Sequence, residues 1–144
     1  MTDCRHRRGQ NMTITLIGTP RTKKNSQRII RRGRFSSILP SEAYTDYASE
    51  CAVQLLAQRA TNVGISYPVN VACVYFMPTH RKVDLVNLLE ATCDILKDNY
   101  VVMDDNSDII ASHDGSRVEY DKKSPRVEIT ITRIESEDAE EAGS

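Results

Sequence analysis

The nine residues Val69–Met77 (VNVACVYFM) constrain the fold of this chain more than any other segment. They are rich in β-branched and aromatic side chains, and a proline bounds them at each end, Pro68 and Pro78. This composition is typical of a β-strand. We therefore expect Val69–Met77 to form a strand in the centre of a sheet.

Two amphipathic helices are predicted, one on each side of this strand in the sequence. The first covers Ser41–Arg59 with Ser41 as its N-cap. Its apolar residues recur at spacings of three and four: Tyr44, Tyr47, Ala48, Cys51, Ala52, Leu55 and Leu56. The second begins at a capping Asp84 and runs to about Leu96 or Lys97. Its apolar positions again have helical spacing: Leu85, Leu88, Leu89, Thr92, Cys93 and Leu96.

Further strands are predicted near the two ends of the chain. Thr13–Gly18 alternates polar and apolar residues, and Arg126–Arg133 (RVEITITR) alternates strictly. Such alternation is the pattern of a strand with one buried face. The stretch Thr19–Ser37 between the first strand and the first helix is too charged to form a core element.

The segment between the second helix and the last strand is predicted to hold shorter elements. Val101–Met103 is a short apolar strand, and Ile109-Ile110 begins another strand-like segment. Asp114-Gly115 is a plausible hairpin turn, with Arg117–Tyr120 as the returning strand. The whole order predicts an α+β fold, a single small domain in which two main helices pack on one mixed β-sheet.

Length and periodicity set the expected limits of this domain. The 144 residues fit one domain of ordinary size, which we place at residues 12–133. Residues 1–11 have no periodic pattern and are expected to be a disordered arm or an upstream extension of the reading frame. Residues 134–144 are acidic and non-periodic, which predicts a disordered tail.

The same sequence argues against a membrane or secreted protein. No apolar run approaches the ~20 residues that a membrane-spanning helix needs, and the N-terminal residues lack the apolar core of a signal peptide. The four cysteines stand singly, with no CxxC spacing, so neither a zinc site nor a disulfide framework is indicated. We expect three of them to be reduced core residues of a cytoplasmic protein.

Charge is distributed unevenly although the formal net charge is only −1. Residues 1–34 carry ten Lys and Arg against one acidic residue, whereas residues 35–132 carry fourteen acidic residues against eight basic ones. A basic end beside an acidic centre suits a polyanionic substrate handled by a carboxylate metal site. An ordinary solvated surface is the alternative.

Two groups of acidic residues are candidates for such a metal site. Helical geometry places one polar stripe on a single side of the second helix: Asp84, Asn87, Glu90 and Asp94. The second group follows the short strand at 101–103: Asp104, Asp105 and Asp108. Carboxylates on separate elements suit Mg²⁺, which prefers oxygen ligands. A solvated helix face and a plain turn are the alternative interpretations.

The sequence gives little support for other common kinds of active site. The only histidines are His6, His80 and His113, and no nucleophile elbow of the GxSxG type is present. The sequence also lacks a P-loop and a GxGxxG motif. His80, beside Arg81 and Lys82, is more simply interpreted as a loop residue than as a catalytic base.

The run from Asp84 to Asp105, DLVNLLEATCDILKDNYVVMDD, resembles the signature of the RusA-type Holliday-junction resolvases. That signature reads D-L-D-N-L-x-K-A-x-x-D-A-L, followed by an apolar strand and a D-D pair. Flanking features agree with it: Lys23-Lys24-Asn25-Ser26 after the first strand, Ser41 to Tyr44 at the first helix, and Pro125-Arg126 before the last strand. The resemblance covers about residues 12–133.

The resemblance implies a small α+β fold, a symmetric homodimer and Mg²⁺-dependent cleavage of four-way DNA junctions. Each subunit would contribute one active site, so that two strands are cut symmetrically across the branch. Such proteins act in DNA recombination and repair and often come from phages or prophages. The expected partner is therefore branched DNA, with Mg²⁺ as the cofactor.

The resemblance also suggests roles for individual residues. Asp84 and Asp105 match two of the family's three catalytic aspartates, but Val86 stands where the third is expected, and Glu90 replaces the family's lysine. We hypothesise that Glu90, one helical turn after Val86, compensates for the missing carboxylate. The alternative is a decayed domain that binds branched DNA without cutting it. Metal binding is assigned to Asp84 and Asp105, completed by Asp104 or Glu90, and Asn87 and Asp94 would support the site by hydrogen bonds.

Basic residues would then hold the DNA backbone by contacts that are independent of sequence. The candidates are Lys23, Lys24, Arg28, Arg31, Arg32, Arg34, Arg81 and Lys82. A third, unrelated possibility is a hydrolase of small phosphoesters. So many basic residues argue against it, because a small substrate does not need so many phosphate contacts.

Overall fold

The computed structural model describes residues 11–23, 27–32 and 35–135, with side chains from residue 41 onwards and in 11–23. Its elements in chain order are β1 (Asn11–Ile17), β2 (Gln27–Arg32), β3 (Phe35–Pro40), α2 (Glu42–Ala57), β4 (Val69–Met77), α3 (Leu85–Asp98), β5 (Ile110–Ser112), β6 (Arg117–Tyr120) and β7 (Arg126–Arg133). Most of the expected N-terminal arm and acidic tail lies outside the described residues, although Asn11 already belongs to β1. Within those residues, no helix combines the length and apolar character needed to cross a membrane.

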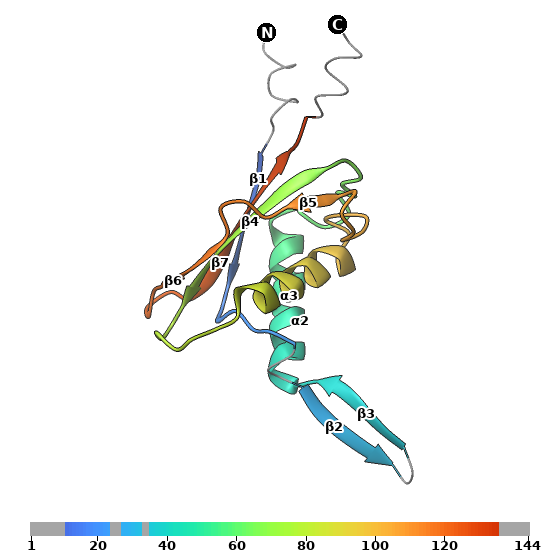
Figure 1. Cartoon of the computed structure of the whole chain (residues 1–144), viewed down its shortest axis with the longest axis vertical. Coiled ribbons are helices and arrows are strands. Elements are labelled where there is room, and N and C mark those ends of the chain that lie inside the picture. Colours follow the sequence, from blue (N-terminus) through green and yellow to red (C-terminus); the bar gives the residue numbers. More distant parts are fainter. Residues whose placement is uncertain (1–10, 24–26, 33–34, 136–144) are drawn as a thin grey trace, which may run out of the picture.

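A mixed five-stranded sheet forms the body of the molecule (Figure 1). Its strand order is β1-β7-β4-β5, and β6 also pairs with β4. β7 is antiparallel to both β1 and β4, whereas β5 and β6 run parallel to β4. The predicted limits of β4 and β7 and the central position of β4 are thus confirmed, as is the α+β class.

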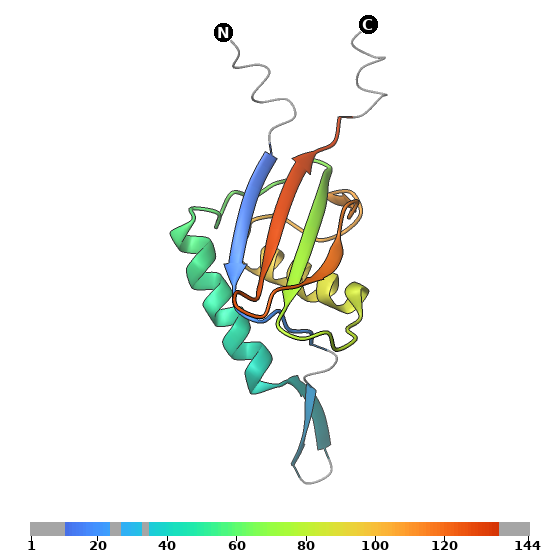
Figure 2. The ribbon, with the colours of Figure 1, turned by 90° about the vertical axis from the view of Figure 1, so that its left-hand side faces the viewer.

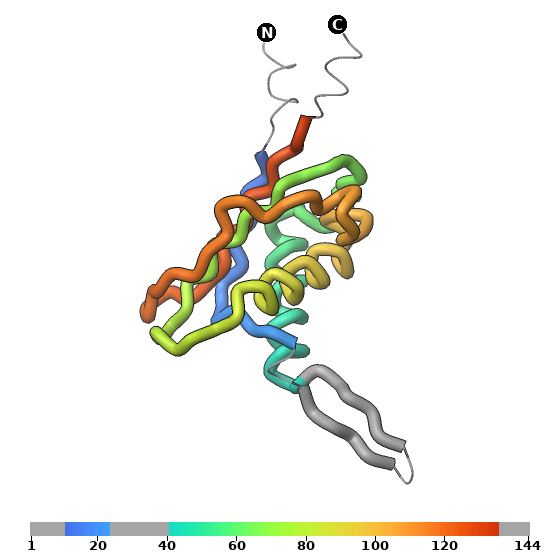
Figure 3. Tube along the Cα trace, viewed as in Figure 1, coloured from blue at the N-terminus to red at the C-terminus, as the bar shows by residue number. Residues whose placement is uncertain are grey.

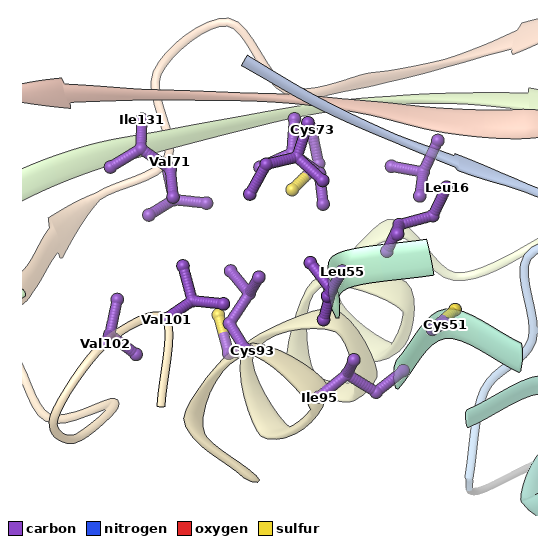
Figure 4. Close-up of a cluster of buried hydrophobic side chains, with 14 of the residues drawn as sticks. Leu16, Cys51, Leu55, Val71, Cys73, Cys93, Ile95, Val101, Val102 and Ile131 are labelled. Carbon is purple, nitrogen blue, oxygen red and sulfur yellow. The ribbon is translucent and has the colours of Figure 1, made fainter. Parts of the chain in front are cut away.

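One face of this sheet is buried under the two helices (Figure 2). Alternate residues of β4, from Val69 to Met77, point into the core, and the same alternation runs along β7. Figure 4 shows side chains of α2 and α3 packed beneath the sheet, among them Leu55 and Ile95. Cys51, Cys73 and Cys93 are free and buried in this core, which confirms the prediction for three of the four cysteines.

Both predicted helices are confirmed, with small differences at their ends. The Ser41 hydroxyl accepts a hydrogen bond from the backbone N–H of Tyr44 at 3.1 Å and caps α2. α2 ends at Ala57 because Arg59 adopts a left-handed conformation, with φ of 60°. Leu56 was predicted to face the core, but its side chain is 66% exposed.

The predicted hairpin at Asp114-Gly115 is wrong. β5 pairs with the start of β4 and β6 pairs with its end, both in parallel register, so the two strands are pieces of one interrupted edge. In the interruption, the His113 Nδ1–H donates to the Val71 carbonyl at 2.8 Å, and the Ser116 hydroxyl accepts from the Cys73 N–H at 3.0 Å. Side chains therefore form hydrogen bonds with the backbone groups of β4 where no neighbouring strand pairs with them.

Two other segments differ from the sequence prediction. The charged stretch after β1 contains an antiparallel hairpin, in which β2 and β3 pair from Gln27–Pro40 to Arg32–Phe35. This pair is a separate two-stranded sheet, which agrees with its exclusion from the core. The apolar run at 101–103 forms no strand and contributes a single bridge between Val102 and Ile65.

The outer edge of β1 is covered by two glutamines of α2. The Gln58 amide pairs with the backbone N–H and C=O of Thr15, at 3.1 and 2.8 Å. Gln54 makes the same two bonds to Ile17, at 2.7 and 3.0 Å. These side chains occupy hydrogen-bonding groups that a sheet edge would otherwise offer to another strand.

Replacing both glutamines, as Gln54→Ala with Gln58→Ala, should destabilise the protein and expose this edge. We expect the free energy of unfolding to fall by about 1–3 kcal/mol, because four hydrogen bonds are lost, and we expect self-association to increase. Urea unfolding and light scattering at rising concentration measure the two effects. The exposed Glu50→Ala on the same helix is the control, and a double variant indistinguishable from it would contradict the prediction.

Candidate functional site

Helix α3 carries the first half of the candidate site, and Asp84 fixes where this helix begins. Asp84 is the N-cap, and its Oδ1 accepts hydrogen bonds from the backbone N–H groups of Val86 and Asn87, at 3.0 and 3.4 Å. Asp84 is exposed. Capping orients the carboxylate at the positive end of the helix dipole, where a negative charge is stabilised.

The second half of the site follows α3 at Asp104 and Asp105. Val101 and Val102 are fully buried just before them, so the acidic residues emerge from a fixed point of the core. The Asp104 Oδ1 accepts the backbone N–H of Asp105 at 2.7 Å, and its Oδ2 accepts the Asn106 amide at 3.1 Å. The sequence therefore folds here into a tight turn that orients Asp104.

Asp104 and Asp105, here called the aspartate pair, are adjacent in this turn, and both are partly exposed. The pKa of Asp104 is lowered, first by the hydrogen bond from the backbone N–H of Asp105 and then by side-chain hydrogen bonds with Asp105 and Asn106. Neighbouring carboxylates repel each other, and a bound cation offsets that repulsion. The donor set thus suits a divalent metal ion.

Among the described residues, however, no three His, Cys, Asp or Glu side chains lie close enough to hold a metal together. The expected set of Asp84, Asp104 and Asp105 is therefore not assembled into one cage. Mg²⁺ is usually held by one or two carboxylates, several waters and substrate phosphates. A pair of aspartates open to solvent fits that mode of binding, whereas a closed three-residue cage is not required.

The polar stripe of α3 is present as predicted, and Val86 lies on it. The Val86 side chain is 70% exposed, and Glu90, four residues later, is exposed on the same side. An apolar side chain thus faces solvent at the end of the helix that Asp84 caps. Glu90 is the next carboxylate in the C-terminal direction along this helix face.

Asp94, at the end of the stripe, is held by a residue from the segment that follows β1. The Lys23 ammonium lies 2.8 Å from Asp94 Oδ2, and it also lies over the Tyr44 ring at 5.8 Å. The pair is partly exposed, with side-chain exposures of 39% and 22%. Lys23 therefore ties the segment after β1 to helix α3, a contact between residues 71 positions apart.

The charges of Asp94 and Asp105 act on a common neighbour. The pKa of the Cys93 thiol is raised to about 12, first by burial and then by Cys73, Asp105 and Asp94. The two aspartates therefore lie within electrostatic range of one buried atom of α3. Asp94 belongs to α3 whereas Asp105 follows it, and Cys93 is their common neighbour.

The predicted DNA-binding residues divide into three groups. Arg81 and Lys82 are exposed in the loop between β4 and α3, next to Asp84, as expected. Lys23 is engaged with Asp94, so part of its role is structural. The side chains of the remaining five lie outside the described set: Lys24, Arg28, Arg31, Arg32 and Arg34.

Comparison with known proteins identifies a family for this chain. The model of the family described as Endodeoxyribonuclease RusA matches residues 17–132, which include both helices and both halves of the site. No curated protein matches the chain. The match covers the greater part of the sequence and ends inside the last strand of the sheet.

Proposed function

This chain belongs to the RusA endodeoxyribonuclease family, and on that premise we propose that it cleaves four-way DNA junctions by Mg²⁺-dependent hydrolysis. The family supports a Holliday-junction endodeoxyribonuclease in general terms. The observation that carries the finer proposal is the aspartate pair, two partly exposed carboxyl groups that follow the buried core in one hydrogen-bonded turn and suit a divalent cation. It lies in the matched range together with Asp84.

Asp84 and Asp105 would hold the metal, and Asp104 would complete the site or orient a water molecule. When bound, Mg²⁺ polarises a phosphate oxygen and lowers the pKa of coordinated water. Asp84 is fixed by its helix-capping bonds and Asp104 by its turn, so both are oriented before substrate arrives. Asn87 and Asp94 would support α3, and Asp94 does so through Lys23.

The basic residues would hold the arms of the junction by their phosphates, with selectivity arising from shape. We propose a symmetric homodimer, because two identical sites are needed to make paired nicks across one branch. Its interface would avoid the β1 edge, which Gln54 and Gln58 already occupy. Arg81 and Lys82 flank Asp84 in sequence and would contact phosphates closest to the scissile bond.

The proposed setting is the recombination and repair of branched DNA, with a phage or prophage origin. The three free, buried thiols suit a reducing compartment, which supports a cytoplasmic location. A function in this compartment is consistent with DNA as the substrate.

A non-catalytic protein that binds branched DNA as a dimer is the second candidate, and one observation favours it. Val86 is exposed at the position where the family resemblance expects a catalytic aspartate. An exposed valine binds no metal, so the site has one carboxylate fewer than the signature. The outcome depends on whether Glu90 restores that carboxylate.

Glu90→Gln tests this replacement. We expect cleavage of a four-way junction to fall by about 10- to 100-fold, the range found for groups that support a metal site, because the amide keeps the size of the side chain but loses its charge. Junction affinity should change little. Glu50→Gln on α2 is the control, and unchanged cleavage by Glu90→Gln with Mg²⁺ would remove Glu90 from the site.

The proposed function itself is tested by comparing a synthetic four-way junction with a linear duplex of equal length, each in Mg²⁺ and in EDTA. We expect cleavage of the junction only, and only with the metal. Tight junction binding without cleavage in Mg²⁺ or Mn²⁺ would favour the non-catalytic candidate. Equal cleavage of junction and duplex, or equal affinity for them, would reject both candidate functions.

A further inference from the structure

An exposed pair of stacked rings lies at one end of the sheet. His80 follows β4 and Tyr120 ends β6, and their ring centroids are 3.8 Å apart with planes inclined by 20°. The contact forms because Met77 and Tyr120 are register partners on adjacent parallel strands. Both side chains are exposed, Tyr120 by 44%, so the stack covers only one face of each ring. We call this pair the aromatic platform.

The turn that follows Tyr120 is built firmly, and it holds two lysines beside the platform. Asp121 Oδ1 accepts the backbone N–H groups of Lys123 and Ser124, each at 3.2 Å, and its Oδ2 accepts the Arg126 guanidinium at 2.9 Å. Arg126 in turn lies over the Phe76 ring at 3.9 Å. Lys122 and Lys123 are exposed at the tip of this turn.

The β4–α3 loop projects at the same end of the molecule as the β6–β7 turn (Figures 1 and 3). Arg81 and Lys82 on the loop therefore join Lys122 and Lys123 as four flanking cations. Within the described part of the chain, none of the four forms an ion pair, whereas the nearby Glu119 pairs with Arg117, and Arg126 is shared between Asp121 and Glu128. The four cations outnumber the carboxylates that these pairs leave unbalanced, so the charge around the platform is positive on balance.

We propose that the aromatic platform stacks an unpaired DNA base while the four flanking cations hold its neighbouring phosphates. This inference rests on the proposed function and specifies how the same site recognises its substrate. Exposed aromatic rings within a positive surface are the general device for binding unpaired nucleotides, since every base offers a ring face. A linear duplex keeps its bases stacked, so the platform favours branched substrates.

The position of the platform relates it to the cleavage site. His80 and Asp84 are four positions apart in the sequence, and four residues of extended chain span at most about 14 Å. Successive phosphates of one duplex strand are about 3.4 Å apart along the axis. The stacked base is therefore within about four nucleotides of the bond next to Asp84.

The test uses the full chain in EDTA, so that binding is measured without cleavage. The probes are a four-way junction with 2-aminopurine at the branch point and a linear duplex with the same substitution. We expect the wild-type chain to quench the 2-aminopurine of the junction alone. Tyr120→Ala should lose this quenching and about 5- to 100-fold of junction affinity, the effect of removing one base-stacking side chain, and Tyr120→Phe should retain both.

Tyr100→Ala is the matched control, because Tyr100 is an exposed tyrosine at the other end of α3. Lys122→Ala with Lys123→Ala is a second variant at exposed positions, and its junction affinity should fall with a salt slope up to about 1.8 smaller, for two lost phosphate contacts. If Tyr120→Ala still cleaves junctions and shows unchanged quenching and unchanged junction affinity, the proposed role of the aromatic platform is overturned, but the proposed function is not. A wild-type chain that does not bind junctions would reject the proposed function itself.

Discussion

Asp105→Asn should stop cleavage of a four-way junction while leaving junction binding intact. We expect the single-turnover rate to fall by more than about 100-fold, because groups that merely support a metal site already cost 10- to 100-fold when removed. The substitution keeps the size of the side chain and removes the charge that would bind Mg²⁺. The rate is measured on a labelled junction at saturating protein, and affinity is measured separately in EDTA.

Asp46→Asn is the control for this experiment. Asp46 is exposed on α2 and is not among the residues assigned to the site, so its loss of charge should leave the rate near that of the wild type. Cleavage retained by Asp105→Asn would remove the aspartate pair from the centre of the proposed site. The proposal would then rest on Asp84 and Glu90 alone.

Charge reversal in the hairpin, Arg31→Glu with Arg32→Glu, is expected to have the second largest effect. Both residues are in β2 and belong to the basic stretch predicted to contact DNA phosphates. Each lost phosphate contact lowers the slope of log affinity against log salt by about 0.9, so two contacts predict a change near 1.8 and a loss of affinity greater than about 10-fold at low salt. Titration of a junction at several salt concentrations measures both quantities.

Arg59→Glu is the control for the variant with charge reversal at Arg31 and Arg32, here called the hairpin variant. Arg59 is exposed at the C-terminal end of α2 and is not among the residues assigned to DNA. If the hairpin variant and Arg59→Glu bind junctions equally well, with the same dependence on salt, the basic stretch has no role in DNA binding. The proposal would then need another surface for the junction arms.

Local signals account for most of the fold that could be predicted. The prolines around β4, the strict alternation of β7, and the capping residues Ser41 and Asp84 act within a few residues of the elements they define. They placed β4 and β7 at their observed limits and both helices within a few residues. The class of the fold follows from the order of these elements.

The sequence predictions were wrong where one local pattern is compatible with two different pairings of strands. Asp114-Gly115 is favourable in a hairpin turn, but here it interrupts a parallel edge strand, because Asn70, His113 and Ser116 satisfy the backbone groups in the gap. β2 and β3 were not predicted, since they form a separate sheet and so lack the alternation that a buried face imposes.

In the candidate site, too, the features that depend on neighbouring residues could be predicted and those that depend on distant residues could not. Its aspartates and the cap at Asp84 could be found from the signature between residues 84 and 105. The Lys23–Asp94 ion pair and the stack of His80 on Tyr120 join residues far apart in the sequence, and no spacing rule predicts such pairs. The position of Lys122 and Lys123 beside this stack follows from the parallel pairing of β6 with β4, which the sequence did not predict.

The most direct test of the proposed function is to map the cuts in a four-way junction whose four strands are labelled in turn. The measurement records which strands the chain cuts in Mg²⁺, and at which nucleotides. We predict nicks in two opposite strands at symmetric positions near the branch, and none in the other two. Nicks scattered along the arms, or a single unpaired nick, would contradict a junction resolvase.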